Sequence, residues 1–279
     1  MKIGVAQISS ALGLIKKNAE KHIEYALMAE KQGISTLLFP ELSLSGYLLE
    51  DASKEVAITK DELFQLFIDT ELTDIDLIAG YAEKEKSGIV YNSQALISIR
   101  KGIPHIAANQ RKINLPTYGM FDESRHFQKG STVERFHLSK NEILSSILIC
   151  EDMWHPLLPA SFLLSETMPQ ALFVPAASPS RGFSGEKPAN LKGWEQNISF
   201  WSGNLGIYIF NSQKVGSEDS FIFSGGSMIA TPDGTIIEAP LFAETIISTE
   251  IDLSLLKSLR QKTQITSIED VAIIKKFLY

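Results

Sequence analysis

The sequence predicts an α/β fold with helices on the outside of a sheet, and three observations lead to this class. The chain begins with an apolar strand (2–8), an amphipathic helix (18–32) and a second apolar strand (36–39), the order of a βαβ unit. Strands and helices alternate again between residues 142 and 211. Hydrophobic residues make up 44% of the 279, which is enough for a sizeable core.

The first elements follow from residue types and their spacing. Helix 18–32 ends at Gly33, a residue suited to the left-handed conformation that closes many helices. Strand 36–39 is stopped by Pro40, which lacks the N–H that a ladder needs. The apolar face of the helix repeats at helical spacing through Ala19, Ile23, Ala26 and Leu27.

The later elements alternate in the same way, with turns between them. The clearest turn is Pro232-Asp233-Gly234. We expect helices at 60–69, 157–166, 189–202 and 253–262, and strands at 76–81, 91–99, 103–108, 142–149, 170–174, 207–211, 227–230, 236–238 and 244–251. With no internal repeat or linker, we expect a single domain over residues 1–279, of which 263–279 form a weakly patterned tail.

Composition excludes several classes of function. A net charge of −7 and the lack of a basic run argue against a nucleic-acid partner and an acidic membrane surface. No apolar run approaches the roughly 20 residues of a membrane span. One cysteine allows no intramolecular disulfide, and with no export signal we expect a cytoplasmic location. The five histidines show no metal-ligand spacing, so no metal is expected.

Three irregular segments each follow a predicted buried strand, and each offers ionisable groups. Glu41 comes directly after the second strand. Residues 111–127 have no clean period, mix charged with aromatic residues, and contain Lys112 and Glu123. Cys150, the only cysteine, ends an apolar run. Loops held by a rigid scaffold often bind or react, although 111–127 could also be an ordinary surface connection.

These groups match what attack on an amide-like carbon requires. The reaction needs a nucleophile, a base that takes its proton and a positive donor for the developing oxyanion. Cysteine, glutamate and lysine fill these roles without a histidine. Taken alone, however, Cys150 is more simply a small buried hydrophobe, because free cysteine is among the most buried residue types.

The surrounding motifs add a resemblance that covers nearly the whole chain. Three segments resemble the signatures of the nitrilase superfamily, the carbon–nitrogen hydrolases: Pro40-Glu41-Leu42, the loop from Arg111-Lys112 to Phe121-Asp122-Glu123, and Ile149-Cys150-Glu151-Asp152. Residues 223–227 and 231–234 resemble the late strand and turn of that family. The resemblance implies a four-layer α-β-β-α sandwich that needs no metal or organic cofactor.

The same resemblance implies a role for each group. Cys150 attacks the carbonyl or nitrile carbon and forms a thioester. Glu41 acts as base toward the thiol and then as acid toward the departing ammonia or amine. Lys112 holds the oxyanion together with a backbone N–H that follows Cys150, and its charge lowers the thiol pKa. Glu123 matches a second glutamate that orients Lys112 or the substrate.

Within the superfamily, the chain looks most like the glutaminase domain of glutamine-dependent NAD synthetases. That branch implies that Tyr118, Phe121, Glu151 and Ser178 bind substrate. It also places a basic residue that can receive the substrate carboxylate six positions after the serine, where this sequence has Ser184. The nearest arginine, Arg181, is therefore our further candidate for substrate binding. The amide therefore stays open among ω-amides, glutamine and N-carbamoyl amines. Glu151 and Asp152 either contact substrate or only structure the turn.

Other functions fit the same motifs. The sequence given shows no synthetase domain, so we expect a free-standing hydrolase that acts on a small-molecule amide, or a glutaminase subunit with a separate synthetase partner. An acyl transferase or a non-catalytic binding protein on this fold are the remaining alternatives. The resemblance implies a homodimer or a higher homo-oligomer, with the apolar tail 263–279 at the interface.

Overall fold

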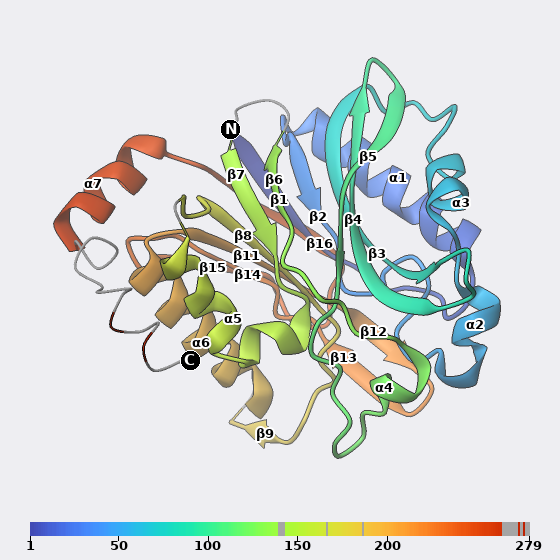
Figure 1. Cartoon of the computed structure of the whole chain (residues 1–279). Coiled ribbons are helices and arrows are strands. Elements are labelled where there is room, and N and C mark those ends of the chain that lie inside the picture. The colour runs from blue at the N-terminus through green and yellow to red at the C-terminus, as the bar shows by residue number, and fades with distance from the viewer. Residues whose placement is uncertain (139–142, 166, 186, 264–272, 274–275, 277–279) are drawn as a thin grey trace.

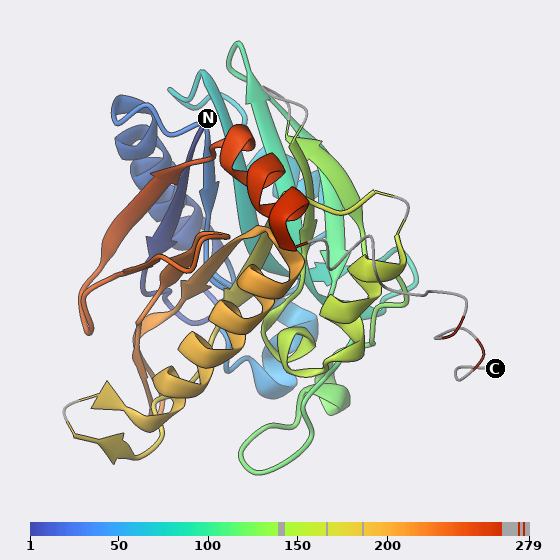
Figure 2. The ribbon, with the colours of Figure 1, turned by 90° about the vertical axis from the view of Figure 1, so that its left-hand side faces the viewer.

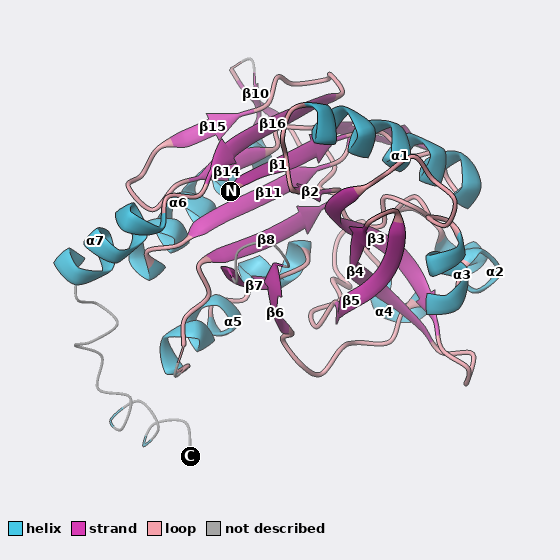
Figure 3. Ribbon diagram, turned by 90° about the horizontal axis from the view of Figure 1, so that it is seen from above, coloured by secondary structure: helices cyan, strands magenta, loops and turns pink. Residues whose placement is uncertain are grey.

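A computed structural model describes residues 1–138, 143–165, 167–185, 187–263, 273 and 276. Most of the predicted tail 263–279 therefore lies outside the described residues. The chain forms two six-stranded sheets that face each other, with helices on the outer side of each (Figure 1). Figure 2 shows α6 and α7 over one face, and Figure 3 shows α1 and α3 over the opposite one.

The first sheet has the order β16-β1-β2-β3-β4-β5. β1, β2 and β3 are parallel, as the βαβ prediction requires, and the remaining neighbours are antiparallel. Its strands are β1 (Lys2–Gln7), β2 (Thr36–Leu38), β3 (Asp74–Lys84), β4 (Val90–Arg100), β5 (Ile103–Arg111) and β16 (Thr245–Glu250).

The second sheet has the order β15-β14-β11-β8-β7-β6. β7, β8 and β11 are parallel. Its strands are β6 (Arg135–Leu138), β7 (Ile143–Ile147), β8 (Ala171–Ala176), β11 (Tyr208–Gln213), β14 (Met228–Ala230) and β15 (Ile236–Glu238). Two further hairpins pair β9 (Phe183–Ser184) with β10 (Lys187–Pro188) and β12 (Val215–Glu218) with β13 (Phe221–Ser224).

The helices of the described chain are mostly short, apart from two of 17 residues each. They are α1 (Ile15–Lys31), α2 (Ser53–Val56), α3 (Lys60–Gln65), α4 (Glu123–His126), α5 (Leu157–Ala160), α6 (Ala189–Leu205) and α7 (Leu253–Thr263). Single 3₁₀ turns lie at Glu50–Ala52, Cys150–Trp154 and Ser161–Leu164. None of the helices in the described ranges is both long and apolar enough to cross a membrane.

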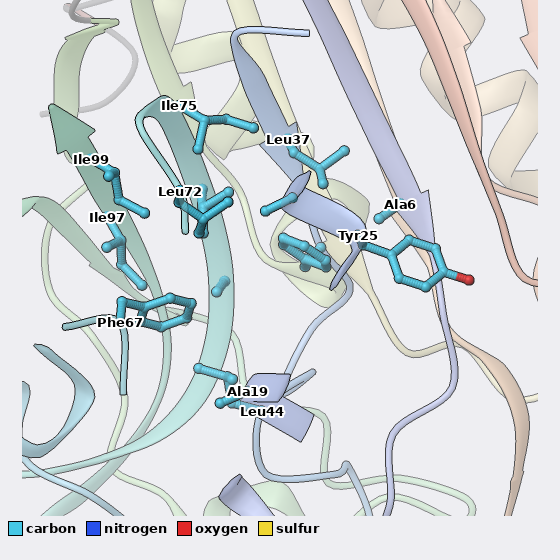
Figure 4. Close-up of a cluster of buried hydrophobic side chains, with 14 of the residues drawn as sticks. Ala6, Ala19, Tyr25, Leu37, Leu44, Phe67, Leu72, Ile75, Ile97 and Ile99 are labelled. Carbon is cyan, nitrogen blue, oxygen red and sulfur yellow. The ribbon is translucent and has the colours of Figure 1, made fainter. Parts of the chain in front are cut away.

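Three buried clusters separate the layers and explain the sandwich. One packs the α1 residues Ala19 and Tyr25 against the first sheet (Figure 4). A second lies between the sheets and joins Val5 to Phe173 and Phe210. A third packs Trp194 and other α6 residues on the outer face of the second sheet. Apolar side chains on both faces of each central sheet thus confirm the predicted four-layer α-β-β-α sandwich.

Some predicted elements have different bounds. The predicted helix 157–166 is one α-helical turn followed by a 3₁₀ turn, because the Ser161 hydroxyl donates to the Leu158 carbonyl (2.6 Å) and competes with the helical pattern. Of the predicted strand 142–149, Ile143 to Ile147 form β7, Leu148 and Ile149 lie beyond its end, and residue 142 lies outside the described residues. Strands β6 and β12 were absent from the prediction because their short runs mix polar and apolar residues, whereas β13 overlaps the late strand that the family resemblance indicates at 223–227.

Candidate active site

Glu41 lies in a tight turn that follows β2 and is fully buried. The turn fits because β3 has a glycine beside it: a Cβ on Gly80 would lie 2.4 Å from the Leu42 nitrogen. Glu41 Oε1 accepts hydrogen bonds from Asn92 Nδ2 (2.8 Å) and Lys112 Nζ (2.6 Å). Its Oε2 accepts the Ala177 N–H (3.0 Å) at the end of β8. Both sheets therefore hold this carboxylate.

Lys112 follows β5 directly and bridges two buried carboxylates. Its Nζ donates to Glu41 Oε1 (2.6 Å) and to Glu123 Oε1 (2.7 Å), and its side chain is fully buried. Burial alone would lower the Lys112 pKa, but the charges of Glu123 and Glu41 outweigh it and hold the pKa well above its usual value. Lys112 is therefore a permanently charged donor between two acceptors.

Glu123 begins α4 and belongs to the same buried cluster. Besides Lys112, its Oε1 accepts the hydroxyl of Tyr47 (2.7 Å). Burial raises the Glu123 pKa to about 7, although Lys112 lowers it in part. The 2.7 Å contact with Nζ fits the expectation that Glu123 orients Lys112.

Cys150 is the first residue of the 3₁₀ turn after β7. Its φ of +46° lies in the left-handed region, which a non-glycine residue adopts only when the surrounding structure imposes it. Burial and the Glu41 charge raise the Cys150 pKa well above its usual value, and Lys112 lowers it only in part. Lys112 thus acts on the Cys150 pKa in the expected direction, but burial and Glu41 outweigh it, so the net shift of the pKa is upward.

Asp152 ties the lysine loop to the cysteine turn. Its buried carboxylate accepts the N–H groups of Asn114 (2.7 Å), Ile113 (3.2 Å) and Ile149 (3.2 Å). Burial raises its pKa to about 6 against these bonds. Of the two alternatives, the structure favours the one in which Asp152 structures the turn.

A cavity of about 270 Å³ opens above Cys150. Glu151 lies at its edge and accepts the Tyr118 hydroxyl (2.9 Å), and the Arg181 guanidinium stacks 4.7 Å from the centre of the Phe121 ring. The structure brings all five predicted substrate-binding residues to this cavity: Tyr118, Phe121, Glu151, Ser178 and Arg181.

Sequence analysis missed several residues around the site. Asn92 lies inside β4, where a buried amide in an apolar strand was an available signal. Tyr47 and Trp154 gave no such signal, because aromatic residues are common in ordinary cores. Asn190 of α6 donates to the Ser178 hydroxyl (3.1 Å) and so supports the loop that carries Arg181. Among the residues that the structure describes, no cluster of His, Cys, Asp and Glu could hold a metal.

The layered fold is that of the nitrilase superfamily. A carbon–nitrogen hydrolase from Helicobacter pylori G27 superposes with a TM-score of 0.80 at 21% identity, covering 100% of this chain and 99% of its own. A mutant of the amidase from Nesterenkonia AN1, of the nitrilase superfamily, gives a TM-score of 0.72 at 21% identity, covering 96% and 97%. At these identities the likeness shows the fold alone.

The chain itself belongs to the Carbon-nitrogen hydrolase family, which matches residues 2–261, and it is a carbon–nitrogen hydrolase enzyme. It is 32% identical over 255 residues to the glutamine-dependent NAD(+) synthetase of Acinetobacter baylyi, covering 90% of this chain and 44% of the relative. The counterpart from Thermotoga maritima is 29% identical, with 91% and 42% covered. The chain thus spans less than half the length of these relatives.

Proposed function

We propose that this chain is a thiol-dependent amidase that cleaves a small linear amide through a thioester on Cys150. The observation that carries the proposal is the buried Glu41–Lys112–Glu123 cluster, in which one ammonium lies 2.6 and 2.7 Å from two carboxylate oxygens beside the only cysteine. We further propose that residues 1–279 act as one hydrolase domain in the cytoplasm, as a homodimer.

The raised thiol pKa sets the order of steps. Glu41 takes the Cys150 proton as the sulfur attacks the carbonyl carbon, because a thiol is a poor nucleophile until it is ionised. The oxyanion is held by Lys112 and the backbone N–H of Glu151. Glu41 then protonates the departing amine, which leaves a thioester. Water, deprotonated by Glu41, attacks the thioester and releases the carboxylic acid and the thiol.

The cavity favours a substrate with charges of both signs next to the amide. Arg181 supplies a cation suited to a carboxylate, and Glu151 with Tyr118 supplies acceptors suited to an ammonium group. Ser178 and Phe121 complete the wall. Glutamine and similar ω-amides of amino acids carry both groups, so we rank them ahead of N-carbamoyl amines, which lack the free ammonium. Ammonia release from a panel of such amides tests this order.

A second candidate function rests on the comparison with longer relatives. Those relatives bear the name glutamine-dependent NAD(+) synthetase, and this chain matches less than half of their length. The chain would then act as a glutaminase subunit that supplies ammonia to a separate synthetase. Glutamine hydrolysis that rises when such a synthetase is added would favour this candidate over an independent amidase.

Replacement of Glu41 by glutamine is expected to lower kcat about 10²- to 10⁴-fold, because general acid–base catalysis typically contributes that much. The amide keeps an oxygen for Asn92 and Lys112 but cannot take the thiol proton. Steady-state kinetics measures the loss, and circular dichroism checks that the fold persists. A folded variant with an unchanged kcat would remove the base assignment.

Replacement of Arg181 by glutamine is expected to raise KM for glutamine about 10- to 100-fold, which corresponds to the loss of a charged hydrogen bond. A neutral amide such as propionamide, which has no carboxylate, serves as the matched substrate and should keep its KM. Equal changes for both substrates would show that Arg181 supports the loop and does not recognise the carboxylate.

A further inference from the structure

A second buried ion pair lies away from Cys150 and is not used by the proposed mechanism. Lys214 follows β11, Glu218 ends β12, and their side chains are 1% exposed each. Lys214 Nζ lies 2.7 Å from Glu218 Oε1 and 5.6 Å from the centre of the Phe223 ring. Among the described residues, no second carboxylate lies within ion-pair distance of Lys214.

A buried ion pair of this kind contributes little net stability to a fold, because desolvation of the charges opposes their attraction. Removing two charges from water costs several kcal/mol per ion, and apolar replacements of buried pairs are often neutral or stabilising. Burial lowers the Lys214 pKa even though Glu218 raises it. The pair therefore calls for a role other than stability.

The second carboxylate oxygen of Glu218, Oε2, connects the ion pair to the catalytic cluster. Oε2 accepts the N–H groups of Tyr47 (2.9 Å) and Leu48 (3.0 Å), which lie in the segment that follows Glu41. Gly46 allows this approach, because a Cβ there would lie 2.8 Å from the Leu12 side chain and 3.1 Å from Glu218 Oε1. Figure 1 shows β12 and β13 at the same end of the molecule as α4.

Tyr47 connects Glu218 to Glu123 through its backbone N–H and its side-chain hydroxyl. Its backbone is held by Glu218, and its hydroxyl donates to Glu123 Oε1 (2.7 Å), the oxygen that also accepts Lys112. The Tyr47 ring packs edge-on against Phe223 at 6.2 Å, so the ring that faces Lys214 also supports Tyr47. A displacement of the Tyr47 backbone would therefore move the hydroxyl that donates to Glu123.

We propose that the Lys214–Glu218 pair is a positioning device for the active site, which acts by anchoring the Tyr47 amide so that the Tyr47 hydroxyl holds Glu123 against Lys112. The inference rests on the proposed function of the Glu41–Lys112–Cys150 site. Lys214 holds the Glu218 carboxylate in place through the 2.7 Å contact, and Glu218 in turn holds the Tyr47 amide. Neither residue of the pair lines the cavity above Cys150.

A double-mutant cycle with glutamine as substrate tests the proposal. We expect Tyr47→Phe and Glu218→Gln each to lower kcat about tenfold with little change in KM, because each disturbs one charge-assisted contact and tenfold corresponds to about 1.4 kcal/mol. If Glu218 acts through Tyr47, the double variant should also lose about tenfold. A hundredfold loss, or a folded Glu218→Gln or Tyr47→Phe variant with wild-type kcat, would overturn the proposal.

The pH profile adds a readout that a purely structural role would not move. Glu123 is faced by Lys112, Glu41 and Tyr47, and the Tyr47 hydrogen bond lowers its pKa. Loss of that bond should shift the acid limb of kcat/KM to higher pH in Tyr47→Phe and in Glu218→Gln, with no further shift in the double variant. An acid limb that stays in place in both single variants counts against the proposal.

Two further variants serve as controls for the ion pair. Asp76→Asn removes the buried carboxylate that pairs with Arg100 (2.6 Å) near the start of β3, so it should lower stability and leave kcat and the acid limb in place. Lys214→Arg keeps the pair and should keep wild-type kinetics. If Glu218→Gln does not fold, Lys214→Gln takes its place in the double-mutant cycle. The Lys214→Gln variant keeps the Glu218 carboxylate but removes the charge that pairs with it.

The outcome also separates this inference from the proposed function. Cys150→Ala that loses activity, together with multiplicative Tyr47 and Glu218 effects, would keep the amidase and remove the positioning device. Cys150→Ala with unchanged activity would remove the amidase mechanism itself.

Discussion

Cys150→Ala is expected to abolish amide hydrolysis, with kcat reduced by at least about 10⁴-fold, because loss of a nucleophile leaves only the residual effect of binding and oxyanion stabilisation. The fold should persist, since alanine is smaller than cysteine and experiences the same backbone strain at a φ of +46°. Initial rates of ammonia release measure the loss, and thermal unfolding checks the fold.

Intact-mass spectrometry tests whether an acyl group becomes covalently attached to Cys150. Wild-type protein mixed with a reactive amide should gain the mass of one acyl group, and hydroxylamine should remove it as the hydroxamate. Since the chain has one cysteine, Cys150→Ala should gain nothing. An adduct of the same mass on the alanine variant would place the covalent step elsewhere, and retained activity would exclude thiol catalysis.

Lys112→Met is expected to cause a smaller loss of activity than Cys150→Ala, together with a large loss of stability. Removing an oxyanion donor typically costs about 10²- to 10³-fold in kcat. Removing one partner of a buried ion pair typically costs about 3–5 kcal/mol, because the remaining charge is uncompensated. Here two carboxylates, Glu41 and Glu123, lose the same partner while they remain buried. Urea unfolding at pH 8 measures the stability change.

The pH dependence of this loss has a definite sign. Without Lys112, burial and the Glu41 charge hold the Glu123 pKa further above its value in the unfolded chain, so the folded variant binds more protons. The deficit relative to wild type should therefore be full at pH 8 and shrink as the pH falls. Lys31→Met, at the exposed end of α1, is the matched control and should change neither property. A deficit that grows toward low pH would contradict this account of the buried cluster.

Much of the fold could be predicted because its signals are local. Helix α1 and strands β1 and β2 follow from periodicity, from Gly33 and from Pro40, all within one stretch of chain. Strand β12 could not be predicted in the same way, because Val215 to Glu218 is too short and too polar to differ from a loop. Its strand character comes from pairing with Phe221 to Ser224.

The residues of the candidate site also separate into those predicted from local sequence and those missed because their contacts are distant in the chain. Glu41, Lys112 and Cys150 were predicted from charged or reactive groups placed directly after apolar strands, with the family motifs around them. Tyr47 and Asn92 were missed, because their hydrogen bonds reach residues 76 and 51 positions away. The lowering effect of Lys112 on the thiol pKa was predicted, but the net rise was not, because it depends on burial and on the balance between Glu41 and Lys112.

By itself, the sequence determined the α/β class, the order of the main elements and the identity of the groups that meet at the site, since each is encoded in a few consecutive residues. Only the tertiary structure decided how those groups act on one another. Lys112 between two buried carboxylates, the position of the thiol near Glu41, and the contacts that lead from Lys214 to Glu123 all depend on distances between segments that lie far apart in the chain. Electrostatic energies depend on separation in space and on burial, and neither quantity is local in the chain.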